Sequence, residues 1–155
     1  MLEFTKKDLK RLVVIGEEIE HQNRKIAKLE KKLYQYSENR PRSADTIMMS
    51  STDVSCRVVK SQVVASAPPS QEEKRTKQEI IKTCHERDVL REEYDKMETE
   101  IKMWLASLDN RIVREILQGR YIERLSVAEV AKRLSYEEGS IRNKEALFWK
   151  DKKNK

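Results

Sequence analysis

The sequence predicts an all-α protein: a long N-terminal helical hairpin or coiled coil, followed by a C-terminal three-helix, helix-turn-helix domain. Charged residues make up 39% of the 155 residues, with only three Gly and three Pro, which is typical of long exposed helices. Two long stretches repeat apolar residues at heptad spacing. A capping sequence near the C-terminus precedes two short amphipathic segments.

Residues 1–36 are expected to form one long helix that begins near Thr5. Apolar residues occupy most of two heptad seams over this stretch. The first seam is Leu12, Ile19, Ile26 and Leu33, and the second is Ile15, Gln22, Leu29 and Tyr36. The pattern fits a helix packed within its own chain or a dimerisation helix equally well.

Residues 37–70 interrupt the helical pattern, because Pro41 stops one helix and Pro68-Pro69 delays the next. The valine pairs Val58-Val59 and Val63-Val64 could form a short hairpin or edge strand. A linker is the alternative for this segment.

Residues 71–108 are expected to form a second long helix with its own apolar stripe. The stripe is Ile80, Leu90, Tyr94, Met97, Ile101, Trp104 and Leu108, with Thr83 and Arg87 as weaker members. The two long helices could pair as an antiparallel hairpin or join two chains in a homo-oligomer. The sequence leaves both arrangements open.

Residues 109–150 are expected to hold three short helices, followed by a basic tail, 151–155, that frays. The first helix covers residues 111–120, with Asp109 as its cap. Ser126 and Glu129 form a capping box that starts the second helix. The third helix is expected to begin near Glu137 or Glu138, where acidic residues suit the helix dipole.

The last two helices have the spacing of a helix-turn-helix, with the small Ala131, the turn residue Ser135 and the branched Ile141 in sequence. The candidate core of this motif is Val130, Ala131, Leu134, Ile141 and Phe148, and Tyr136 is also expected to be buried. Other three-helix bundles contain two helices and a turn, so the spacing favours the motif without requiring it.

Candidate DNA contacts lie mainly on the last helix, where Arg can read guanine and Asn can read adenine. The residues expected near base edges are Ser140, Arg142, Asn143 and Lys144. Lys132, Arg133 and Lys150 are candidates for phosphate contacts. Residues 109–155 hold twelve Lys and Arg against eight Asp and Glu, so much of the net charge of +6 lies here.

The sequence contains no catalytic constellation and no glycine-rich phosphate loop, so we expect no enzymatic activity and no cofactor. Cys56 and Cys84 are far apart with only two His in the chain, so we expect no metal site. We expect no membrane segment, because no apolar run approaches the ~20 residues that span a bilayer. Since residues 1–10 also lack the apolar core of a signal peptide, we expect a protein of the host cell cytoplasm or nucleoid. The many Glu and Lys are interpreted as solvated helix faces.

Residues 108–149 resemble region 4 of sigma factors. The resemblance is carried by Arg120-Tyr121-Ile122, Leu125-Ser126, Glu129-Val130-Ala131 and Gly139-Ser140-Ile141. The order of the whole chain, with Thr52-Asp53-Val54 and Val59-Lys60-Ser61 in the long connection, is similar to phage and prophage regulators of the ArpU and RinA type. This resemblance implies a regulator of phage or prophage genes that binds double-stranded DNA and could also contact RNA polymerase.

Two other interpretations fit the sequence. A phage DNA-packaging protein of the terminase small subunit type also pairs a helix-turn-helix with oligomerising helices, although it usually carries the motif at its N-terminus. A protein–protein adaptor could contact RNA polymerase without binding DNA. The acidic pair Glu137-Glu138 at the start of the last helix favours the adaptor.

Overall fold

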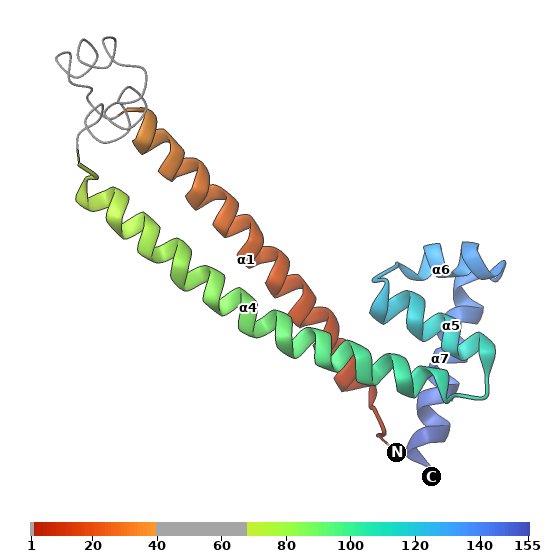
Figure 1. Ribbon diagram of the computed structural model, residues 1–155. Coiled ribbons are helices and arrows are strands. Elements are labelled where there is room, and N and C mark those ends of the chain that lie inside the picture. The colour runs from red at the N-terminus through yellow and green to blue at the C-terminus, as the bar shows by residue number, and fades with distance from the viewer. Residues whose placement is uncertain (1, 40–67) are drawn as a thin grey trace, which may run out of the picture. The chain divides into compact units, whose positions relative to one another are not determined.

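The computed structural model describes residues 2–39 and 68–155, and every element in these two ranges is helical (Figure 1). The all-α class is therefore confirmed for these residues. The elements are α1 (Lys6–Glu38), α4 (Gln71–Ala106), α5 (Arg111–Leu117), the π-helix η1 (Gln118–Ile122), α6 (Val127–Leu134) and α7 (Glu138–Lys153). The valine pairs suggested as a hairpin or edge strand lie outside the described residues.

The chain divides into two compact units, and both α1 and α4 contribute to each of them. The first unit consists of Met1–His21 and Arg87–Lys155, and the second consists of Gln22–Glu86. The second half of α1 and the first half of α4 thus belong to the second unit. The first unit contains all of α5, η1, α6 and α7. The candidate DNA contacts therefore all lie in the first unit.

In the second unit, the heptad positions of α1 and α4 are the shielded ones. Ile26 is 5% exposed, and Leu29 and Leu33 are half-buried. Thr83, a weak member of the predicted stripe, is only 1% exposed. Its hydroxyl donates to the Glu79 carbonyl 2.7 Å away, so its polar group is satisfied within the helix and its methyl group can pack.

The first unit has a main core that joins the two ends of the chain. Residues from the start of α1 pack with the end of α4, with α5 and with the C-terminal part of α7. The buried members are Phe4, Leu9, Leu12, Ile101, Trp104, Leu105, Val113, Leu117, Tyr121 and Trp149. Two of these rings pack against the ring of Trp104, whose centroid is 5.8 Å from that of Phe4 and 6.3 Å from that of Trp149. Because aromatic rings bury large areas, this group is a major source of stability in the unit.

A smaller core of the first unit lies where α5, α6 and α7 meet (Figure 1). Ile116, Val130, Ala131 and Ile141 are its buried members, each 3% exposed or less. Half-buried Leu134 packs against the same group. This core fixes how α6 and α7 are held against α5.

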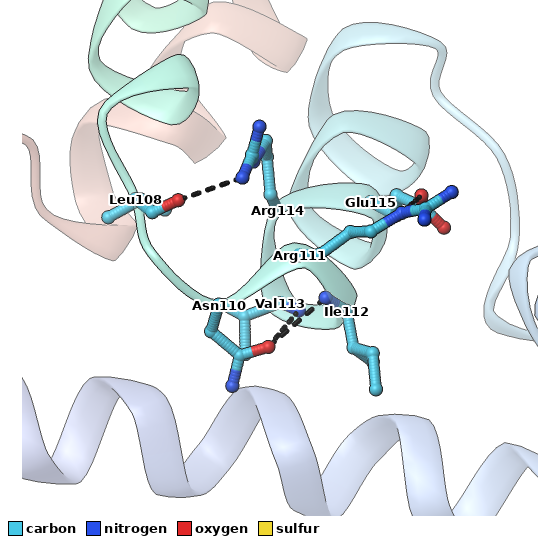
Figure 2. A network of polar contacts seen from close by, with 7 residues as sticks. All are labelled: Leu108, Asn110, Arg111, Ile112, Val113, Arg114 and Glu115. Carbon is cyan, nitrogen blue, oxygen red and sulfur yellow. Dashed lines mark hydrogen bonds and ion pairs between the residues drawn. The ribbon is translucent and has the colours of Figure 1, made fainter.

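The cap of α5 is Asn110, so the prediction of Asp109 is wrong by one residue. The Asn110 side-chain oxygen accepts hydrogen bonds from the backbone N–H groups of Ile112 and Val113, at 3.1 and 3.2 Å (Figure 2). Figure 2 also shows Arg114 donating to the Leu108 carbonyl, 3.0 Å away. Both contacts fasten the short connection between α4 and α5.

The helix predicted for residues 111–120 ends as an α-helix at Leu117 and continues as the π-helix η1. The backbone N–H of Glu123 donates to the Gln118 carbonyl at 3.0 Å, five residues back. A Cβ on Gly119 would lie 3.0 Å from a methyl carbon of Val130. The missing side chain at Gly119 therefore allows η1 to approach α6 closely.

The expectation of a frayed tail at 151–155 is wrong for its first three residues, because α7 continues to Lys153. The Lys152 ammonium donates to the Phe4 carbonyl at 2.6 Å and lies 4.3 Å from the centre of the Trp104 ring. Burial lowers the pKa of Lys152, and the nearby carboxylates of Glu3 and Asp8 oppose this shift. These contacts hold the last turn of α7 in place.

Candidate functional site

The start of α6 is set by the predicted capping box. The Ser126 hydroxyl accepts from the Glu129 backbone N–H at 3.2 Å, and the Glu129 carboxylate accepts from the Ser126 backbone N–H at 2.7 Å. Hydrogen bonds from Ser126 lower the pKa of Glu129, with the larger effect from the backbone N–H and the smaller from the hydroxyl. Because both ends of the box are satisfied, α6 begins at a defined residue.

A left-handed residue, Ser135, ends α6 and turns the chain toward α7. Its φ of 59° and ψ of 40° lie in the αL region, which often ends a helix. The next backbone N–H, that of Tyr136, donates to the Ala131 carbonyl at 2.9 Å. α7 then begins at Glu138, within the range that the sequence predicted.

The prediction that Tyr136 is buried is wrong, because this residue is 39% exposed. The reversal of the chain at Ser135 leaves Tyr136 on the outside of the turn. The Lys144 ammonium lies 5.3 Å from the centre of the Tyr136 ring. Lys144 is half-buried. It is one of the four residues expected near base edges, and in this structure its ammonium group makes a cation–π contact with Tyr136 instead.

The candidate motif core falls into two groups. Val130, Ala131 and Ile141 are buried together in the smaller core, and Leu134 packs against them. Phe148 instead packs on the main core, with its ring centre 4.9 Å from that of Trp149. Phe148 is therefore separated from the other four candidates and helps to anchor the second half of α7.

The first two turns of α7 present polar side chains to the outside. Arg142 and Asn143 are exposed, and Ser140 is half-buried. Arg142 pairs with Glu138 one turn earlier, at 3.7 Å between nitrogen and oxygen. Exposed pairs of this kind contribute about 0.3–0.5 kcal/mol, so the Arg142 guanidinium can exchange this partner for another at little cost.

The three candidate phosphate contacts lie in two places. Lys132 and Arg133 are both exposed on the last turn of α6, where Arg133 pairs with Glu123. Lys150 is ten residues after Ser140 on α7, about 15 Å along the helix axis at 1.5 Å per residue. The structure thus brings Lys132 and Arg133 near the turn and places Lys150 at the other end of α7.

A buried carboxylate, Glu145, holds the middle of α7 to η1. Glu145 is 2% exposed, and it accepts a hydrogen bond from the Tyr121 hydroxyl at 2.6 Å. Its other oxygen pairs with the guanidinium of Arg120, and the Lys6 ammonium lies 3.7 Å away. The interpretation of the Glu residues as a solvated face is therefore wrong for Glu145.

The pKa values of this group follow from its contacts. Burial alone would raise the pKa of Glu145, but the Tyr121 hydroxyl and the positive charges of Arg120 and Lys6 outweigh it and lower this pKa. Burial and the contact with Glu145 raise the pKa of Tyr121 well above 10. Glu145 is therefore charged and Tyr121 neutral in the folded protein at neutral pH.

The described residues contain no group of three or more His, Cys, Asp or Glu that could hold a metal ion. Among the helices of residues 2–39 and 68–155, none has both the length and the apolar character needed to cross a membrane. Comparisons with protein-family models, with curated proteins and with solved structures found no match. The chemistry of its own side chains is therefore the basis for assigning a role to this surface.

Proposed function

We propose that this protein is a sequence-specific DNA-binding transcriptional regulator in which α6, the turn at Ser135 and α7 act as a helix-turn-helix. The observation that carries the proposal is the division of α7 into two sides. Ile141 and Glu145 anchor one side in the protein, and Asn143, about half a turn from Ile141, is exposed. A helix anchored in this way can enter a major groove with its polar side first.

The side chains on this exposed side suit contacts to bases and phosphates. Arg142 can donate two hydrogen bonds to guanine, and Asn143 can pair with adenine. Lys132 and Arg133, at the end of α6, are suited to the phosphates beside the groove. Glu138 and Glu123 now neutralise Arg142 and Arg133, so DNA would replace two surface ion pairs.

The resemblance to region 4 of sigma factors and to ArpU and RinA regulators extends the proposal. The regulated genes would be those of a phage or prophage, and the protein would also touch RNA polymerase. The long helices α1 and α4 would serve a homo-oligomer or a partner through apolar side chains that remain exposed, among them Val14, Ile81 and Val89, because seam residues such as Ile15 and Ile26 are already buried.

Retention of sheared genomic DNA tests the proposal directly. The purified full-length protein is mixed with DNA of its source genome at two salt concentrations, and the retained fragments are sequenced. We expect a few discrete sites that persist at the higher salt, because base contacts are less sensitive to salt than phosphate contacts. Uniform retention that vanishes with salt would refute sequence-specific binding and favour the adaptor.

Replacing Arg142 and Asn143 together by Ala should weaken binding to a retained site by at least about tenfold, since each bidentate base contact contributes about 1–3 kcal/mol of discrimination. Fluorescence anisotropy with a labelled duplex measures this loss. The matched control is Arg75→Ala with Gln78→Ala, which removes the same charge from exposed positions on α4. If the two variants bind the duplex with equal affinity, Arg142 and Asn143 of α7 do not contact DNA.

A further inference from the structure

A lysine-rich trough in the first unit lies between the N-terminal residues and the C-terminal turns of α7. Its volume is about 850 Å³, within the range of pockets that hold drug-sized ligands. Six lysines line it: Lys6, Lys7, Lys10, Lys150, Lys152 and Lys153. The only acidic residue in its lining is Glu3, so the trough is strongly positive.

Most of these positive charges are not used by the fold. Lys152 is held by the Phe4 carbonyl and the tryptophan rings, and Lys6 lies beside Glu145. The other four are exposed and form no ion pair with the residues that the structure describes. They are Lys7, Lys10, Lys150 and Lys153. Four unneutralised ammonium groups around one hollow favour a ligand with several negative charges.

The trough also has an apolar part. Ala146 and the largely buried Trp149 contribute to its lining, and lysine side chains carry apolar methylene stems beneath their ammonium groups. Such a surface can take apolar side chains at its centre while the ammonium groups meet carboxylates at its rim. A small inorganic anion would leave the apolar part unoccupied.

The DNA duplex bound by the start of α7 does not suit this trough. Lys153 is eleven residues beyond Arg142, about 16 Å along α7 at 1.5 Å per residue. A major groove is only ~8.5 Å deep and ~12 Å wide. If α7 enters the groove by its N-terminal end, the trough faces away from the bases, and a double helix is too broad to fill a hollow of this size.

We propose that the trough binds an acidic, partly apolar peptide segment of a partner protein. Its carboxylates would pair with Lys7, Lys10, Lys150 and Lys153, and an apolar side chain would rest against Trp149. This inference goes beyond DNA binding; only the exclusion of duplex DNA from the trough rests on the proposed function, and the peptide test below is made without DNA.

Selection from a library of random displayed peptides tests this proposal on the full-length protein without DNA. The library is first depleted on the variant Lys7→Gln/Lys10→Gln/Lys153→Gln and then selected on the unmodified protein. Tryptophan fluorescence measures the affinity of the selected peptides, since Trp104 and Trp149 are the two tryptophans of the chain and Trp149 lines the trough. The control variant Lys132→Gln/Arg133→Gln/Arg142→Gln removes the same charge from the other surface.

We expect the selected peptides to combine Asp and Glu with apolar residues. They should bind the trough variant about tenfold more weakly than the unmodified protein, as the loss of three exposed ion pairs implies, and the control variant with little change. The proposal is overturned if no peptide is enriched, if the enriched peptides are not acidic, or if both variants lose affinity equally. It is also overturned if only the trough variant loses affinity for duplex DNA, because phosphates would then be the ligand.

Discussion

Replacing Glu145 by Ala should lower the free energy of unfolding of the first unit by about 3–5 kcal/mol, the usual cost of breaking a buried ion pair. Glu145 is the acceptor for the buried Tyr121 hydroxyl and the partner of Arg120. Without it, Tyr121 retains a buried donor with nothing to receive its hydrogen bond, and Arg120 retains an uncompensated charge. Urea unfolding followed by tryptophan fluorescence measures the loss.

Two variants separate the ion pair from a general effect of removing a carboxylate. Glu145→Gln keeps an acceptor for Tyr121 but removes the charge, so its loss of stability should be smaller than that of Glu145→Ala. Glu115→Ala removes the partner of Arg111 from a surface pair and should cost at most about 0.5 kcal/mol. If Glu145→Ala costs no more than Glu115→Ala, the network around Glu145 does not stabilise the unit.

The stability of the first unit should also depend on pH through Glu145 and Tyr121. Because the folded pKa of Glu145 is lowered, its contribution is present above the unfolded value near 4.5 and is lost as the pH falls through the folded value. The folded pKa of Tyr121 is raised, so its contribution is present below pH 10 and is lost as the pH rises further. Unfolding curves across both ranges should show a weaker acid dependence in Glu145→Gln, and an unchanged dependence would contradict the assignment.

Replacing Ile141 by Ala should cost about 2–5 kcal/mol, because it leaves a cavity among Ile116, Val130 and Ala131. Ile141 is fully buried and is the main apolar anchor of the first turns of α7. The milder Ile141→Val should cost about 0.5–1.5 kcal/mol. Thermal unfolding of the three proteins measures this series.

Leu147 provides the matched control for Ile141, since it lies on the same helix but is 58% exposed. Leu147→Ala should change stability by about 0.5 kcal/mol or less. If Ile141→Ala and Leu147→Ala have similar effects, α7 is not held by the smaller core.

The sequence predicts the helices well where their apolar residues repeat. Leu12, Ile15 and Ile26 are buried because heptad spacing places them on one face of the helix over many turns. One residue that departs from such a long pattern does not change the prediction of the helix. Capping is less predictable. Asp109 and Asn110 can both accept backbone hydrogen bonds, and the path of the chain out of α4 decides which one does so.

The role of Glu145 is hard to predict from the sequence for a different reason. Its spacing of four residues from Ile141 and from Trp149 did place it on the buried side of α7, so a signal was present. Its hydrogen-bonding partners, Arg120 and Tyr121, are adjacent residues of η1, and nothing in the sequence pattern indicates that Gln118–Ile122 forms a π-helix. Long-range polar contacts of this kind depend on how elements meet in space, which a periodic pattern does not contain.

The first unit is built from two pieces of chain separated by the whole of Gln22–Glu86. Phe4 and Trp104 can meet only after this intervening unit has brought its two ends together, so we expect slower folding than a bundle of sequential helices would show. The entropy of closure grows only with the logarithm of loop length, and each doubling costs about 0.6 kcal/mol. The unit should therefore tolerate large changes in the length of the intervening chain far better than the loss of its first ten residues, which supply Phe4 and Leu9 to its core.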